Sequence, residues 1–272
     1  MSELKLPPNP VHPPIVSASV GWHVAMLAAA VAQPAWWPVW LGGVAANHLG
    51  LCAASMWPRS TLLGPNIRQL PPSAASAGHV CITIDDGPDP EITPRVLQML
   101  ADANARASFF CIGDKVDQYP ALVEQIVAQG HSVENHTQTH HHRFAFRGKS
   151  GLHTEIASAQ KSIANVAGQA PRFFRAPAGM RNPFLQPVLA SLGLCLTSWT
   201  RRGFDTVERS PDKVFARLTR QLAAGDILLI HDGHGAHTSQ GSSVVLEALP
   251  RLLAEVSARE LRPVTLPQAF AP

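Results

Sequence analysis

The pattern of apolar and polar positions divides the chain into two parts. From Leu6 to Pro58 the sequence contains no Asp, Glu, Lys or Arg. Within this stretch, residues 15–33 and 36–57 each approach the about 20 apolar residues that a membrane-spanning helix needs. The segment QPAWWP between them is typical of a tight turn, with tryptophans where an aromatic belt at a membrane interface would place them. The pattern therefore predicts a membrane-spanning helical hairpin within residues 1–58.

Two other structures fit this apolar segment less well. A cleaved signal peptide would need a more basic start than MSELKLPPNP and a shorter apolar run. A hairpin buried in a soluble core stays open as an alternative, because Ala, Gly and three histidines dilute the hydrophobicity. The flanking cations Lys5, Arg59 and Arg68 would lie on one side of a bacterial-type inner membrane. The positive-inside rule then favours the cytoplasmic side for the rest of the protein.

After the hairpin the pattern changes its period. Residues 59–78 are rich in Pro, Ser, Ala and Gly and are predicted to form a linker. From residue 79 onward, short apolar runs such as HVCITID alternate with helical patterns such as ITPRVLQMLADANA. About seven strands that alternate with helices predict an α/β fold with a parallel sheet, closed or nearly closed into a barrel. We expect one domain over residues 79–272.

Composition narrows the classes of function. The net charge of +3 and the 15% share of charged residues exclude a nucleic-acid-binding arm and an acidic tail. The four cysteines form no CxxC pair, and Cys81, Cys111 and Cys195 lie inside apolar strand-like runs. We therefore expect free, buried thiols, which favour a reducing compartment.

Ionisable residues stand at the ends of five predicted strands, where parallel barrels collect their reactive groups. They are Asp85 and Asp86, His136, Arg175, Asp205 and His231. Because the carboxyl ends of parallel strands meet at one edge, we expect these side chains to form one site.

The sequence HTQTH at residues 136–140 indicates a metal site. Two histidines four residues apart would lie on one face of a helical turn and offer one ion two imidazoles. The pattern is not HExxH, so a zinc-protease interpretation lacks its general base. If one of Asp85 and Asp86 is the third ligand, the other can accept a proton. An Asp-Gly-Pro turn without chemistry is the alternative for this pair.

The remaining strand-end residues would support such a site. Arg175 can pair with a carboxylate at the mouth of the barrel. His231 can serve as a general acid if Asp205, or in its place Asp232, keeps it protonated. Four further histidines could line the cleft or be solvated loop residues, and the second interpretation is favoured: His141, His142, His234 and His237.

In order and in combination, these motifs resemble the polysaccharide deacetylases of the NodB-homology type, carbohydrate esterase family 4, over about residues 79–265. TIDDGP resembles the family's TFDDGP, which implies Asp85 as the base and Asp86 as a metal ligand. HTQTH fits H[ST]xxH and implies His136 and His140 as the other ligands. The resemblance implies a distorted (β/α) barrel of seven strands and a divalent metal, usually zinc.

The later motifs carry the rest of the resemblance. RAPAG resembles RxPYG, which implies that Arg175 orients the base. LLIH resembles the LxH motif and implies His231 as the general acid, with Asp205 of WTRRGFDT tuning it. Two positions depart from the family: Ala178 stands where tyrosine is frequent, although its backbone N–H can still stabilise an oxyanion, and Thr206 replaces a tryptophan.

The implied reaction is hydrolysis of an N-acyl group, normally acetyl, on an amino sugar of a glycan or of a lipid-linked sugar. Basic residues near the site suit a lipid phosphate or anionic membrane headgroups: Arg143, Arg147, Lys149, Arg201 and Arg202. The alternatives are a deformylase of a lipid-phosphate-linked formamido sugar, a non-catalytic glycan-binding barrel on a membrane anchor, and an unrelated metal hydrolase. The expected partners are the amino-sugar substrate and membrane lipid, without nucleic acid.

Overall fold

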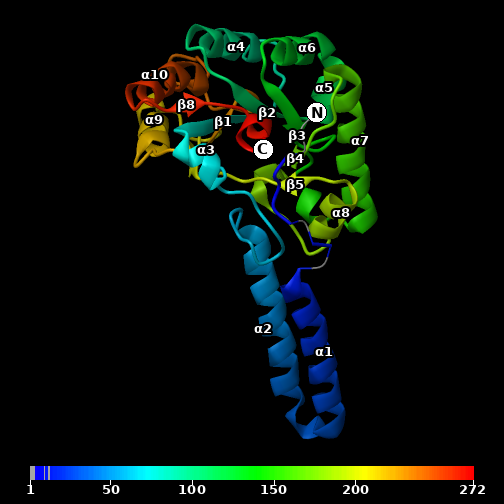
Figure 1. The fold of residues 1–272 in the computed structure, drawn as a ribbon. Coiled ribbons are helices and arrows are strands. Elements are labelled where there is room, and N and C mark those ends of the chain that lie inside the picture. Colours follow the sequence, from blue (N-terminus) through cyan, green and yellow to red (C-terminus); the bar gives the residue numbers. More distant parts are fainter. Residues whose placement is uncertain (1–3, 9, 12) are drawn as a thin grey trace.

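The computed structural model describes residues 4–8, 10–11 and 13–272, and it contains the predicted hairpin. Helices α1 (Pro14–Ala32) and α2 (Trp37–Met56) are joined by the short helix η1 (Pro34–Trp36) and project away from the rest of the molecule (Figure 1). Both apolar segments are long and apolar enough to cross a membrane. Their apolar side chains are mostly exposed, so the hairpin is not a core element of the barrel.

Polar contacts hold the two helices of the hairpin together. Asn47 Nδ2 donates to Ser19 Oγ at 2.8 Å, and the Nε2 atoms of His23 and His48 lie 3.2 Å apart. Trp22 Nε1 donates to the carbonyl of Gly43 at 3.0 Å. Such contacts are the usual means of pairing helices where the hydrophobic effect between them is weak.

The domain that follows is built on one curled, parallel sheet. Seven strands are hydrogen-bonded in the order β5-β4-β3-β2-β1-β7-β6, and β8 pairs with the start of β1. Among the described residues no strand pair joins β5 to β6, so the barrel stays open at that seam, as a distorted (β/α)7 barrel should. The strands are β1 (His79–Asp85), β2 (Ala107–Cys111), β3 (Ser132–Asn135), β4 (Phe173–Phe174), β5 (Cys195–Leu196), β6 (Arg201–Arg202), β7 (Ile227–His231) and β8 (Arg262–Pro263).

Most of the helices surround the outer face of this sheet, whereas α11 (Leu266–Ala269) packs with its inward side chains (Figure 1). Apolar side chains of α4 and α10 pack on the outward side chains of β1 and β7 in one large core. The helices are α3 (Pro72–Ser76), α4 (Thr93–Asp102), α5 (Gly113–Gln118), α6 (Pro120–Ala128), η2 (Phe144–Phe146), α7 (Lys149–Ala167), η3 (Pro177–Gly179), α8 (Leu185–Ser191), α9 (Pro211–Thr219), α10 (Val244–Ala258) and α11 (Leu266–Ala269).

The alternation of side chains along β1 and β7 decides which residues point into the barrel. Ile82 and Ile84 belong to the outer core, whereas Cys81 belongs to the inner one. Because successive side chains of a strand point to opposite faces, Asp85 lies on the inner side with Cys81. The same alternation on β7 puts His231 inside, and the register pairs it with Asp85 on the neighbouring strand.

Residues 59–78, expected as a linker, are tied to the barrel along most of their length. Ile67 N donates to the carbonyl of Leu196, and Leu70 N donates to the carbonyl of Gly225, each at 2.9 Å. Leu63, Ile67 and Leu70 are buried, and the last two pack on inward residues of the sheet and on α11. Their apolar side chains close the inside of the barrel below the polar strand ends. We therefore propose that this segment belongs structurally to the barrel domain.

The four cysteines are free thiols, and Cys81, Cys111 and Cys195 are buried, as the sequence predicts. Burial raises the pKa of the Cys81 thiol to about 12. The three buried cysteines act as small apolar side chains of the sheet.

Candidate active site

The two adjacent aspartates stand where β1 ends. Asp85 is its last residue, and Asp86 leaves the strand in the left-handed conformation with φ 73°. Lys115 Nζ donates to the Asp86 carbonyl at 2.7 Å and fixes the turn. The backbone of Gly233 packs so closely against this carbonyl that a Cβ at residue 233 would lie 2.3 Å from it. The turn thus gives neighbouring carboxylates two different directions.

Asp85 is paired with Arg175. Arg175 Nη1 donates to Asp85 Oδ1 at 2.5 Å and to Thr83 Oγ1 at 2.9 Å. Its Nη2 donates to the Ser198 carbonyl at 2.8 Å, and its guanidinium stacks on the ring of Phe110. Burial lowers the pKa of Arg175, and the nearby charge of Asp85 opposes this shift. A buried cation with this many partners can hold the Asp85 carboxylate in one orientation.

The HTQTH segment is a loop, and the expectation of a helical turn was wrong. Thr137 and His140 both have left-handed φ values, 68° and 49°. Asn135 Oδ1 accepts the Thr137 N–H, and Thr137 Oγ1 accepts the His140 N–H. The buried carboxylate of Glu155 accepts the N–H and the hydroxyl of Thr139. Side-chain hydrogen bonds to the backbone, and not the helical repeat, bring the two imidazoles together.

Asp86, His136 and His140 form a group that could hold a metal ion, with one donor atom from each within 4.8 Å of the others. Asp86 Oδ1 lies 3.2 Å from both imidazole Nε2 atoms, yet it is buried and satisfied by no hydrogen bond among the described residues. His136 Nδ1 donates to the Arg175 carbonyl at 2.8 Å, which leaves the Nε2 lone pair free for a ligand.

The protonation states fit the same site. Burial lowers the pKa of His140 to about 3, and the neighbouring His136 adds to the shift, so the His140 imidazole is neutral at physiological pH. Burial alone would raise the pKa of Asp86, but the imidazoles of His136 and His234 outweigh it and hold the pKa well below its usual range. An ionised carboxylate and neutral imidazoles are the forms that bind divalent metals.

The other half of the site is the pair of His231 and Asp205. Asp205 Oδ1 lies 3.0 Å from His231 Nδ1, and Asp205 Oδ2 accepts the backbone N–H of His231 at 2.7 Å. Burial alone would lower the pKa of His231, but the charge and hydrogen bond of Asp205 overcome it and raise the pKa to about 9. Asp232, the other candidate for this role, bonds to Thr93 instead. Of the two carboxylates, Asp205 is the partner.

Ala178 lies in η3, directly after β4 and Arg175. Its φ of 53° is left-handed, a conformation that costs a residue with a Cβ roughly 1 kcal/mol or more. Next to it, Gly179 is packed against Trp199 and Pro58, and a Cβ at this position would lie 2.5 Å from the Pro58 Cβ. The strained loop is held from both sides at the edge of the cavity.

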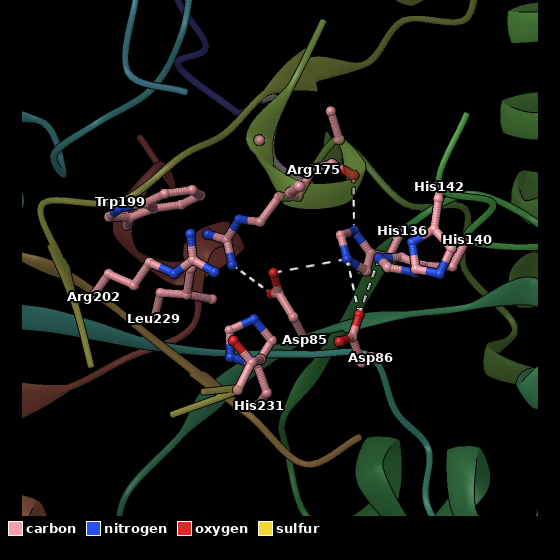
Figure 2. Close-up of a pocket in the computed structure, with 14 residues that line it drawn as sticks. Asp85, Asp86, His136, His140, His142, Arg175, Trp199, Arg202, Leu229 and His231 are labelled. Carbon is pink, nitrogen blue, oxygen red and sulfur yellow. Dashed lines mark hydrogen bonds and ion pairs between the residues drawn. The ribbon is translucent and has the colours of Figure 1, made fainter. Parts of the chain in front are cut away.

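All eight residues singled out from the sequence lie together, and seven of them line one cavity of about 210 Å³ (Figure 2). The eighth residue, Asp205, lies behind His231 and pairs with its Nδ1. The cavity also contains side chains that the motifs gave no role, and these are His142, Trp199, Arg202, Thr206 and Leu229.

The extra histidines are not all remote. His142 lines the cavity, and His234 Nδ1 lies 3.3 Å from Asp86 Oδ2, although the His234 side chain is 59% exposed. The histidine-rich segments that follow β3 and β7 were the only signal that could have placed them here.

Comparison with known proteins extends the resemblance. The family model described as polysaccharide deacetylase matches residues 73–196. A chitooligosaccharide deacetylase of Sinorhizobium fredii is 34% identical over 168 residues, which cover 61% of this chain and 78% of that protein. The chain belongs to the polysaccharide deacetylase family. A peptidoglycan-N-acetylglucosamine deacetylase of Bacillus cereus is 29% identical over 192 residues, which cover 71% of this chain and 68% of that protein.

Solved structures show the same fold. The family 4 carbohydrate esterase from Streptomyces lividans, in complex with acetate, is 31% identical and aligns with a TM-score of 0.64 over 71% of this chain and 96% of its own. This polysaccharide deacetylase is thus a hydrolase of the type that acts on amide bonds. A family 4 pseudoenzyme from Bacillus anthracis, 21% identical, aligns over 76% of this chain and 69% of its own with a TM-score of 0.67, so the fold by itself does not decide activity.

Proposed function

We propose that this polysaccharide deacetylase is a metal-dependent hydrolase that removes the N-acetyl group from an amino sugar and releases acetate and a free amine. The observation that supports it best is the convergence of three units on one cavity: the Asp85–Arg175 pair, the group of three potential ligands, and the Asp205–His231 pair. A glycan-binding barrel without activity would have no need of all three.

Asp86, His136 and His140 would hold the metal. Two imidazoles and one carboxylate suit zinc and other divalent first-row ions. Bound there, the ion would supply Lewis acidity, which polarises the amide carbonyl and makes water a stronger acid. The buried and unsatisfied Oδ1 of Asp86 is the feature of this chain that such an ion would complete.

Asp85 would act as the general base. Its Oδ1 is taken by Arg175, while its Oδ2 lies 3.8 Å from Nε2 of the ligand His136. The second oxygen therefore faces the potential ligands, where it can accept a proton from the attacking water. Arg175 holds the carboxylate in this orientation.

His231 would act as the general acid on the leaving amine. Its raised pKa, about 9, keeps it protonated at neutral pH, and Asp205 fixes its Nδ1 so that Nε2 is the free donor. The backbone N–H of Ala178, at the edge of the same cavity, would stabilise the oxyanion that forms on the acyl carbon. Each step of the hydrolysis then has its own residue.

The base can be tested with Asp85→Asn. Because asparagine keeps the shape but cannot take the proton, we expect deacetylation of chitooligosaccharide or a peptidoglycan fragment to fall by about 10²- to 10⁴-fold. Metal content should stay at the wild-type level, since Asp85 is not among the proposed ligands. Near-wild-type rates in a variant that keeps its metal would refute this role.

We also propose that residues 1–58 anchor the catalytic domain, residues 79–272, in a membrane. The exposed apolar side chains of α1 and α2 support this, as do Trp57 and Arg59 where the hairpin ends, a pairing common at membrane interfaces. The charge bias favours the cytoplasmic side. A reporter fused to the carboxyl terminus tests the orientation, because a periplasmic signal would contradict it.

A further inference from the structure

The adjacent arginines of β6 have different partners. Arg201 Nε donates to Asp226 Oδ2 at 2.5 Å, and its Nη atoms donate to the carbonyls of Arg220 and Gln221. Arg202 instead lines the cavity. Successive side chains of a strand point to opposite faces, so only Arg202 can reach a substrate. The sequence did not distinguish the two.

Arg202 is a cation without an anionic partner among the described residues. It forms no ion pair there, its Nε is buried without a hydrogen bond, and its guanidinium lies 5.3 Å from the Trp199 ring centre and 5.0 Å from that of Phe204. The other two cations of the site have carboxylate partners: Arg175 pairs with Asp85, and His231 pairs with Asp205. Arg202 is thus the one cation lining the cavity that has no carboxylate partner among the described residues.

This charge lies away from the potential metal ligands. Figure 2 shows Arg202 and Trp199 on one side of Asp85, and His136, His140 and His142 on the other. An amide at the ligand side would therefore leave another part of the same sugar next to Arg202. A neutral glycan would offer this guanidinium no charge, whereas a phosphate can accept two parallel hydrogen bonds from it.

The edge of the cavity is attached to the end of the hairpin. Gly179, which lines the cavity, packs against Pro58, two residues after α2. Two residues further on, Arg181 N donates to the Ser55 carbonyl of α2 at 3.2 Å, and the buried Arg181 guanidinium donates to the Ser60 carbonyl at 2.6 Å. A hairpin in a membrane would hold this edge of the cavity near the headgroups.

We infer that the substrate is an amino sugar linked through phosphate to a lipid, with Arg202 binding the phosphate at the membrane surface. The inference rests on the proposed function and adds the substrate class to it. In the reaction, water adds to the amide carbonyl, the carbon–nitrogen bond breaks, acetate leaves and the amine takes the proton. The phosphate ester stays intact and serves only for recognition.

The first test measures binding and does not depend on turnover. Calorimetry with the full-length protein compares N-acetylglucosamine 1-phosphate with N-acetylglucosamine. Wild type should prefer the phosphate by about 10- to 100-fold, the range for a hydrogen bond to a charged group. Arg202→Gln should remove the preference, Arg202→Lys should keep part of it, and Arg209→Gln, an exposed arginine outside the cavity, should keep all of it.

A wild type without the preference, or an Arg202→Gln variant that keeps it, would overturn the inference. If no substrate is deacetylated while the preference still depends on Arg202, the proposed function fails and the anion site stands. Thermal unfolding of each variant separates a lost contact from a lost fold.

The second test identifies the source of the phosphate. Deacetylation is compared for N-acetylglucosamine 1-phosphate in solution and for the same headgroup on a polyprenyl chain in phosphatidylcholine vesicles. A kcat/KM at least about 10-fold higher for the vesicle substrate is expected, because the hairpin raises the local concentration of substrate. Equal values would overturn presentation on a lipid and leave a soluble sugar phosphate as the ligand of Arg202.

Discussion

The site has a metal half, formed by Asp86, His136 and His140, and an acid half, formed by Asp205 and His231. The two halves differ in how many of their buried carboxylate oxygens have hydrogen-bond partners within the chain. In the metal half, Asp86 Oδ1 is buried beside two imidazoles and bonds to no described group. In the acid half, Asp205 is fully buried, and both of its oxygens are engaged by His231. One half is built to be completed by a ligand from outside, and the other is complete in the folded chain. We therefore expect the loss of Asp86 to act on metal binding and the loss of Asp205 to act on the pKa of His231.

The largest effect is expected from Asp86→Ala. Loss of a ligand should release the metal and lower kcat/KM by at least about 10³-fold, since Lewis-acid stabilisation is worth several kcal/mol. Stability in the presence of a chelator should fall at neutral pH, because His136 and His234 hold the Asp86 pKa below its usual range and the ionised carboxylate therefore favours the folded state. Added zinc should raise the melting temperature of wild type only. A variant that keeps both its metal and its activity would show that Asp86 is not a ligand.

A smaller, pH-dependent effect is expected from Asp205→Asn. A general acid must be protonated, so wild-type kcat/KM should fall as the pH rises through the His231 pKa of about 9. Without the charge of Asp205, burial prevails and lowers this pKa, so the alkaline limb moves to lower pH. At pH 8 we expect a loss of about 10-fold or more, which shrinks toward acid pH.

The pH profile of kcat/KM measures this shift, and His231→Gln serves as the control that should lack the limb altogether. An unmoved limb in Asp205→Asn would mean that another group keeps His231 protonated. Unlike Asp86→Ala, Asp205→Asn should retain bound metal, which separates the two halves by metal analysis alone.

The smallest effect is expected from Ala178→Gly, in the loop that belongs to neither half. Glycine adopts the observed φ of 53° without strain and keeps the N–H, so kcat/KM should change by less than about 3-fold. Ala176→Gly is the matched control: Ala176 has an ordinary φ of −78° and is buried, so the change should lower the free energy of unfolding by about 1 kcal/mol. A 10-fold loss for Ala178→Gly would give the methyl group a role in catalysis.

The sequence predicted the barrel and the meeting of the strand ends because both follow from short-range patterns. The period of two on β1 and β7 puts Asp85 and His231 inside, whatever the loops do. The helical hairpin could also be predicted from the sequence, since its length and lack of charged residues are properties of composition.

What could not be predicted depends on the direction of single side chains and on long-range packing. The spacing of His136 and His140 fits a helix, but Asn135 and Glu155 hold the segment as a loop. Arg201 and Arg202 look alike until the sheet sends one to Asp226 and the other into the cavity. The Pro- and Ser-rich composition of residues 59–78 correctly lacks a period, yet it gives no sign that Ile67 fits the seam of the barrel.

The contacts of Arg181 bear on how a soluble enzyme could be produced. Its buried guanidinium donates to the carbonyls of Ser60 and Gly64, so a shortened protein that starts near residue 79 would leave this guanidinium without these acceptors. The same cut would remove Pro58 from beneath Gly179 and leave a gap under the loop of Ala178. A truncation that begins at Pro58 keeps these supports, and expression trials should start there.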